Sequence, residues 1–239
     1  MMKKLGILGG LGPMATAYFF QLIIQMTQAE TDQEHIESII YNCPSIPDRT
    51  QFILKKSTCS PLPSMMKAIQ KLVGQGVDIC AIPCITAHYF HKELTTAVSV
   101  PVVHGIEETA SYLKQRNIKK AGIMATDGTV QTMLFSQEFE KKGITCIYPS
   151  ALGQSYIMEL IYKNIKAGLP VEIDKFHTVS EELYASGAEV ILLGCTELSM
   201  IKKDFSVGSG CLDVMEVLAK CCVEMCGAHL NTQYNELIT

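Results

Sequence analysis

The sequence has no block of basic residues, and its 20 Lys and Arg are outnumbered by 24 Asp and Glu, giving a net charge of −4. Binding along a phosphate backbone requires a concentrated positive surface, so we expect no nucleic-acid partner. The sequence also lacks an apolar stretch approaching the roughly 20 residues that cross a bilayer, so no membrane partner is expected. What it does contain is 48% hydrophobic residues among 239, enough to bury a core and to exclude disorder as the main state.

The two common nucleotide-binding motifs are also absent. Residues 6–12 are rich in glycine but do not have the Gly-x-Gly-x-x-Gly spacing, and no Walker lysine pattern occurs. The second expected strand ends at Tyr41 and Asn42, where a dinucleotide fold would carry an acidic residue for the ribose. A glycine turn whose backbone N–H groups face a carboxylate is the better interpretation of this segment.

The ten cysteines contain no paired Cys-x-x-Cys motif. The apolar run near the N-terminus is too short for the core of a signal peptide, so we expect a cytoplasmic protein with free thiols. Most of these cysteines should be small buried hydrophobic residues. Cys222, Cys226 and His229 have a spacing that would share one helical face and suit zinc, but buried core cysteines are the favoured interpretation and no metal is expected.

Short β-rich runs alternate with longer amphipathic stretches, which is the pattern of βα units around a parallel sheet. Strands are expected at residues 5–8, 36–41, 77–82 and 100–103, and helices at about 15–28 and 214–226. The order repeats: residues 76–84 align without a gap with residues 187–195. This repeat is too long for a solenoid and indicates two related lobes.

We therefore predict an α/β protein with two pseudo-symmetric Rossmann-like lobes, each a parallel sheet flanked by helices, and an active site in the cleft between them. The first lobe should comprise residues 1–114 plus about 210–239, and the second lobe residues 115–209. Cys84 and Cys195 fall at equivalent points, just past the carboxyl end of a strand, where open α/β sheets bind ligands.

Two lobes facing each other would place Cys84 and Cys195 on opposite walls of one cleft. Racemisation requires such an arrangement, because a base must act on one face of a tetrahedral carbon and an acid on the other. A helix N-terminus beside each thiol is expected to lower its pKa. The alternative is that both are buried structural cysteines. His88, four residues after Cys84, either tunes the thiol or is an ordinary buried helix residue.

Several motifs resemble those of the aspartate/glutamate racemase family. They occur in the same order and extend from about residue 3 to residue 220. The matching segments are Gly9–Thr16, Asn42–Thr50, Pro83–His88, Ala125–Thr129, Ile165–Gly168 and Leu193–Leu198. The resemblance implies an enzyme that works without pyridoxal phosphate or another cofactor and uses a pair of cysteines. Family members commonly form dimers, so a homodimer is expected.

The resemblance implies that Cys84 and Cys195 are the catalytic pair. It implies a substrate-binding set of Gly10, Arg49, Gln51, Thr86, Thr126, Lys166 and Thr196. One departure is Ile85, which replaces the Asn that the family usually carries after its first cysteine, and this leaves the choice of substrate open.

Residue chemistry alone leaves alternatives for the charged positions. Arg49 offers a planar fork that suits a carboxylate, or it forms a surface ion pair. Lys166 either holds substrate or is a cation at a helix C-terminus. Asp48 either orients Arg49 or caps a turn.

The function predicted from the sequence is racemisation of a free acidic amino acid, aspartate first and glutamate second. One thiolate would remove the Cα proton while the opposite thiol protonates the other face. A hydantoin racemase or a maleate cis–trans isomerase on the same scaffold would keep both cysteines and change the carboxylate contacts. A non-catalytic amino-acid-binding protein would keep the pocket without turnover, and a redox or metal module is a third alternative.

Overall fold

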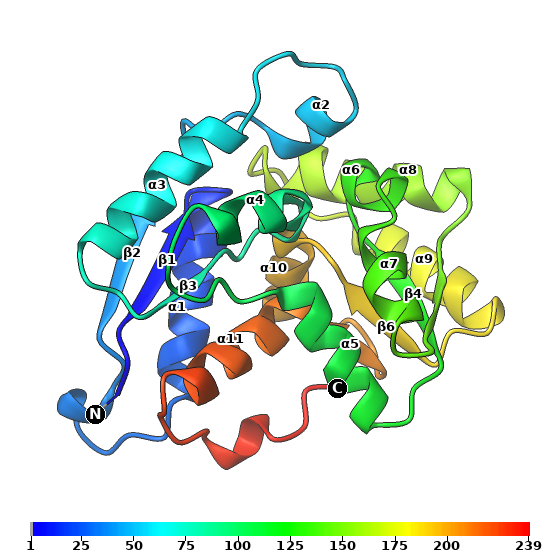
Figure 1. Cartoon of the computed structure of the whole chain (residues 1–239). Coiled ribbons are helices and arrows are strands. Elements are labelled where there is room, and N and C mark those ends of the chain that lie inside the picture. Colours follow the sequence, from blue (N-terminus) through cyan, green and yellow to red (C-terminus); the bar gives the residue numbers. More distant parts are fainter. Residues whose placement is uncertain (1) are drawn as a thin grey trace.

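Two separate parallel sheets organise the chain (Figure 1), and the computed structural model describes residues 2–239. The first sheet has the order β2-β1-β3 and the second β5-β4-β6-β7, with parallel pairing between all neighbours. Their strands are β1 (Leu5–Gly9), β2 (Ser38–Asn42), β3 (Ile79–Ala81), β4 (Lys120–Met124), β5 (Thr145–Ile147), β6 (Val190–Leu193) and β7 (Cys211–Asp213). The predicted fold class is confirmed.

Helices cover both faces of each sheet, as parallel strands require when they are buried on both sides. The helices of the first half are α1 (Pro13–Met26), η1 (Asp32–Glu34), α2 (Arg49–Ile53), α3 (Leu62–Gly74), η2 (Ile85–Phe90), α4 (His91–Thr96) and α5 (Gly105–Gln115). In the second half they are α6 (Asp127–Gln131), α7 (Leu134–Glu140), α8 (Ala151–Glu159), η3 (Leu160–Ile165), α9 (Ile173–Ala185), α10 (Thr196–Asp204), α11 (Val214–Met225) and η4 (Thr232–Tyr234). The η3 segment is a π-helical turn, and the other η segments are 3-10 helices.

Strand alternation assigns each sheet face to a different core. Leu5 and Ile7 of β1 pack in a core shared by the two lobes, whereas Leu8 faces a second core inside the first lobe. In β4, Ile123 belongs to the shared core and Met124 to the core of the second lobe. The shared core also takes residues from α1, α5 and α11, and Figure 1 shows α5 and α11 between the two sheets. A continuous apolar core therefore holds the lobes together.

The sequence-predicted elements agree with the structure except at their ends and at one strand. The first helix begins at Pro13, two residues earlier than expected. Residues 100–103 form only an isolated bridge between Cys80 and Val102, because Pro101 has no N–H to extend a ladder. The division of the chain into lobes stays a proposal. β7 pairs with β6 and is therefore part of the second sheet. With that division, the chain would return to the first lobe at α11 rather than near residue 210.

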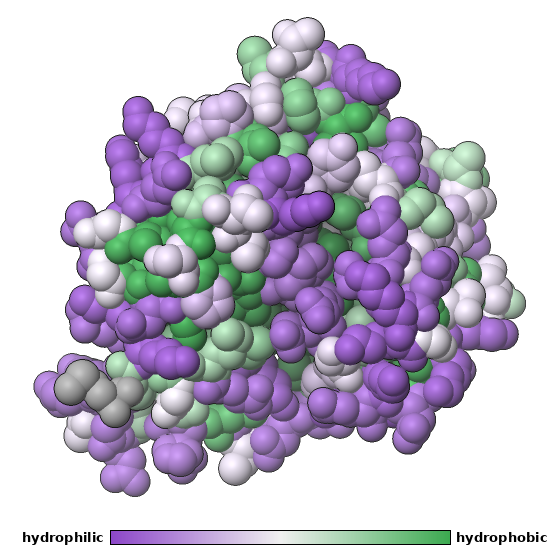
Figure 2. Space-filling view, viewed as in Figure 1, coloured by the Kyte–Doolittle hydropathy of each residue, from purple (hydrophilic) through white to green (hydrophobic). Residues whose placement is uncertain are grey.

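The surface drawn in Figure 2 is mostly hydrophilic, with hydrophobic residues gathered beside α3. Leu72, Ile39 and Tyr41 line a shallow hollow in this part of the first lobe. Among the described residues, no helix combines the length and apolar character needed to cross a membrane.

Three histidine rings are grouped where η2 meets the start of α5. His88 is buried, with its Nε2 3.2 Å from the carbonyl oxygen of Ile82, and its ring centre lies 5.2 Å from that of His104. His88 does not line the cavity that holds the cysteines. Burial, followed by the nearby His104 and His91, lowers the pKa of His88 well below 6.5. This residue is therefore neutral in the folded protein near neutral pH.

We expect the wild-type protein to lose more stability on acidification than the His88→Gln variant. Since the pKa of His88 is lowered by folding, the unfolded chain takes up a proton first as the pH falls below about 6.5, which favours unfolding. The difference should grow by up to about 2 kcal/mol between pH 6.5 and pH 5. Urea unfolding at several pH values measures it, with His177→Gln on α9 as the control. Parallel pH dependences for wild type and His88→Gln would contradict this assignment.

Candidate active site

Equivalent elements of the two lobes carry Cys84 and Cys195. Cys84 follows β3 and precedes η2, and Cys195 follows β6 and is the N-cap residue of α10. Both are buried, and both line one narrow cavity of ≈ 10 Å³, which is room for about one water molecule. The fold thus brings together at one point two thiols that are far apart in the sequence.

The thiol of Cys195 is held by a carboxylate. Its Sγ donates a hydrogen bond of 2.9 Å to Oε2 of Glu197, which is itself buried. Burial raises the pKa of Cys195 well above its ordinary value, and the charge of Glu197 raises it further. The prediction that a helix N-terminus lowers the pKa of this thiol is therefore wrong, because desolvation and the neighbouring carboxylate outweigh the helix dipole and Lys166.

Arg49, the first residue of α2, reaches into the same region with a buried guanidinium. Its Nη2 donates to the carbonyl oxygen of Leu11 at 3.1 Å and its Nη1 to that of Pro47 at 3.2 Å. Its Nε has no hydrogen-bond partner among the described residues. Burial alone would lower the pKa of Arg49, but neighbouring Cys84 and Asp48 raise it, so the cation is retained. The surface ion-pair alternative does not apply.

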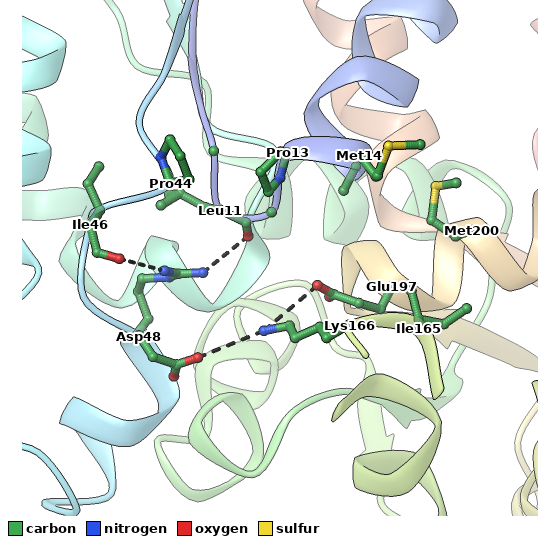
Figure 3. A pocket seen from close by; sticks show the side chains of 14 residues that line it. Leu11, Pro13, Met14, Pro44, Ile46, Asp48, Ile165, Lys166, Glu197 and Met200 are labelled. Carbon is green, nitrogen blue, oxygen red and sulfur yellow. Dashed lines mark hydrogen bonds and ion pairs between the residues drawn. The ribbon is translucent and has the colours of Figure 1, made fainter. Parts of the chain in front are cut away.

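Lys166 follows η3 and places its ammonium group between two carboxylates (Figure 3). Its Nζ lies 3.8 Å from Oδ2 of Asp48 and 3.8 Å from Oε1 of Glu197. Burial opposes the charge, but Glu197 and then Cys195 raise the pKa of Lys166 above its ordinary value. The ammonium also lies over the ring of Tyr162, at 4.3 Å from the ring centre. This lysine is a site cation rather than only a helix-end charge.

Four threonine hydroxyls connect the two lobes at the cavity, which Thr50, Thr86 and Thr126 line. Thr86 Oγ1 lies 3.0 Å from Thr126 Oγ1 and 3.1 Å from Thr129 Oγ1, and Thr50 donates to Thr126 at 3.2 Å. All four side chains are buried. The three that line the cavity offer hydroxyl groups that can both donate to and accept from a polar substrate, and Thr129 supports Thr86 and Thr126 from behind.

The remaining sequence-predicted residues lie in different places. Gly10 lines a second, larger chamber beside this cavity; its φ is +91°, and a side chain there would meet the backbone of Cys43. Thr196 donates to Glu197 at 3.0 Å and borders a small void beside Cys84. Gln51 lines none of these cavities. Its backbone N–H donates a hydrogen bond of 2.8 Å to Oδ1 of Asp48, the N-cap residue of α2. The capping alternative for Asp48 is confirmed.

Ile85, the departure from the family pattern, does not line the cavity. Its side chain is buried in the core shared by the lobes, close to Gly105 and His88. The side chain of Ile85 therefore does not contact a ligand bound in the cavity.

The residues that line the cavity but are not in the sequence-predicted site are Leu11, Asp48, Thr50, Tyr162 and Glu197. Glu197 had a signal, because it stands two positions after Cys195 at the start of a helix, from which a side chain can turn back to the thiol. Asp48, Thr50 and Tyr162 join the site through contacts across the lobes, which no local pattern reveals.

A larger chamber opens from this narrow cavity. It has a volume of ≈ 500 Å³ and shares Leu11, Asp48, Arg49, Lys166 and Glu197 with the cavity that holds the thiols. Within residues 2–239, no cluster of His, Cys, Asp and Glu is arranged to hold a metal ion, at the site or elsewhere.

A comparison with known families decides the assignment. The profile described as Asp/Glu/hydantoin racemase matches residues 8–222, which include both cysteines, Arg49 and Lys166. The chain belongs to this family. It is an isomerase, an amino-acid racemase similar to aspartate racemases.

Relatives that match nearly the whole chain support this assignment. The chain is 30% identical to the broad specificity amino-acid racemase RacX of Bacillus subtilis, over 90% of this chain and 95% of that protein. The aspartate racemase of Picrophilus torridus has a TM-score of 0.83 and 27% identity, covering 97% of each chain. A putative Asp/Glu racemase of Yersinia pestis shares the fold, with a TM-score of 0.79 and 24% identity over 94% of this chain and 99% of that one.

Proposed function

We propose that this racemase interconverts L- and D-aspartate, with glutamate as a second substrate, by proton transfer between two thiols and without a cofactor. The observation that carries the proposal is the shared cavity: Cys84 and Cys195, from equivalent ends of the two lobes, line it together with Arg49 and Lys166. Racemisation at Cα needs an acid and a base on opposite faces of the carbon, and cations for the carboxylate.

In the proposed step, the thiolate of one cysteine takes the Cα proton, and the electron pair of the C–H bond moves into the α-carboxylate. The thiol of the other cysteine then gives its proton to the opposite face of Cα, and becomes the thiolate. The negative charge that develops on the carboxylate is stabilised by Arg49 and Lys166, which stay cationic inside the site. The reverse reaction exchanges the two roles.

The resting site supports different starting roles for the two cysteines. Cys195 donates its proton toward Glu197, as an acid would, whereas Cys84 has the Arg49 guanidinium as its neighbour. A carboxylate partner keeps a buried thiol protonated, which makes Cys195 the acid and leaves the role of base to Cys84. We therefore assign Cys84 as the first base and Cys195 as the first acid.

The relatives support the substrate class. The aspartate racemase of Picrophilus torridus has 27% identity over nearly the whole chain, and the relative at 30% identity is described as having broad specificity. Aspartate is therefore the first substrate to test, and other amino acids belong in the same experiment. A homodimer in the cytoplasm remains part of the proposal.

We expect the wild-type protein in D2O to incorporate deuterium at Cα of L- and D-aspartate and to invert each enantiomer. Proton NMR follows the loss of the Cα signal, and chiral chromatography follows the inversion, with glutamate in parallel. A sample treated with a thiol-alkylating reagent until both cavity cysteines are modified is the control and should be silent. Exchange only with a 5-substituted hydantoin or isomerisation only of maleate would replace the proposed substrate. Folded, untreated protein that is silent on every substrate would overturn the function.

A further inference from the structure

The outer chamber is far larger than the catalytic step needs. Its volume of ≈ 500 Å³ lies within the roughly 300–1,000 Å³ of sites that enclose much larger ligands than a four-carbon amino acid. It meets the narrow cavity of the thiols at the wall of charged residues described above. A substrate whose Cα lies between the thiols has this chamber as the space for its side chain.

The wall of the chamber away from the charged residues is apolar. Figure 3 shows Met14 beside Met200 on one side and Pro44 with Ile46 on the other. The uncharged lining comprises Gly10, Leu11, Gly12, Pro13, Met14, Ala15, Pro44, Ile46, Ile165 and Met200. Beyond the shared charged wall, this lining presents no cation for a second carboxylate. It is suited to a hydrocarbon chain.

The chamber wall carries no surplus positive charge that would favour an acidic side chain, and the thiolate proposed for Cys84 adds a negative charge in the adjoining cavity. The chamber wall carries two carboxylates, Asp48 and Glu197, and two cations, Arg49 and Lys166. A zwitterionic amino acid adds one charge of each sign, so the balance is kept when its side chain is neutral. Aspartate adds one uncompensated negative charge and leaves the apolar wall uncovered.

We propose that the chamber lined by Met14, Pro44, Ile46, Ile165 and Met200 is the side-chain subsite, and that the substrates include amino acids with long, unbranched apolar side chains. This inference rests on the proposed two-thiol racemisation at the adjoining cavity and extends its substrate class. Each methylene group buried in the chamber should favour the reaction about fourfold, the equivalent of about 0.8 kcal/mol.

A homologous series of substrates tests the depth of the chamber. Alanine, 2-aminobutyrate, norvaline and norleucine differ by one methylene each, and Cα exchange in D2O gives kcat/KM for every member. We expect a rise of about sixtyfold over the three methylenes. Exchange with aspartate combined with a flat or falling series overturns the subsite and leaves the function standing. Silence on aspartate, glutamate and the whole series overturns the function itself.

Two substitutions of Met200 connect the series to the chamber. Met200→Trp should fill the chamber and flatten the series, and Met200→Ala should extend the rise to longer side chains. Leu152→Trp is the matched control, because Leu152 is 61% exposed on α8 and lines none of the cavities described above. A series that both Met200 variants leave unchanged places the side chain elsewhere and overturns the proposal. If Met200→Trp does not fold, Met200→Ala alone decides.

Discussion

Replacing either Cys84 or Cys195 by alanine is expected to lower racemisation at least about thousandfold, because each variant lacks the acid or base on one face of Cα. The loss should not be symmetrical. The variant that keeps Cys195 should still exchange the α proton of one enantiomer with retention, and the variant that keeps Cys84 should do so for the other enantiomer. In both variants the second face has no proton donor, so exchange proceeds without inversion.

The measurement is Cα deuterium incorporation for each enantiomer, combined with chiral analysis of the product. Cys80→Ala is a matched control, since Cys80 is also a buried cysteine but lies in β3 and does not line the cavity. It should keep the wild-type balance between exchange and inversion. Racemisation at the wild-type rate in either Cys84→Ala or Cys195→Ala would contradict the two-thiol mechanism.

The sequence predicts the architecture well because parallel βα units leave a strong periodic signal. The gap-free match of residues 76–84 with residues 187–195 reflects two strands, β3 and β6, that end at equivalent points and deliver Cys84 and Cys195 to one cavity. Buried strands of this kind appear in the sequence as runs of apolar residues, in either lobe. The weak strand at residues 100–103 is the exception, because Pro101 interrupts its hydrogen bonding.

The chemistry of the site is less accessible from sequence because it depends on where side chains point. Ile85 stands next to Cys84 in the chain, yet its side chain joins the shared core instead of the cavity. The environment of Cys195 is also misjudged from the helix alone, because burial and the carboxylate of Glu197 determine the pKa of its thiol. Contacts such as Lys166 to Asp48 join distant parts of the chain and require the fold to be known.

Glu197→Gln is expected to lower racemisation about ten- to a hundredfold, the amount that follows from weakening a hydrogen bond to a charged group. Glu197 Oε2 accepts from Sγ of Cys195 at 2.9 Å and from Oγ1 of Thr196 at 3.0 Å, so it fixes the position of the thiol. Its negative charge also helps to raise the pKa of Cys195, after burial. Removing the charge should lower that pKa, so the thiol loses its proton at a lower pH.

The pH dependence of kcat/KM distinguishes this role from simple support of the fold. In the direction where Cys195 is the acid, activity falls as its thiol ionises, so the alkaline limb should move to lower pH in Glu197→Gln. Glu197→Asp keeps the charge and should return the limb toward its wild-type position. Glu181→Gln, which removes an exposed carboxylate of α9 outside the cavity, should alter neither the rate nor the profile. A slower Glu197→Gln enzyme with an unmoved alkaline limb would show that the carboxylate only supports the structure, because its charge would then not reach the proton that Cys195 transfers.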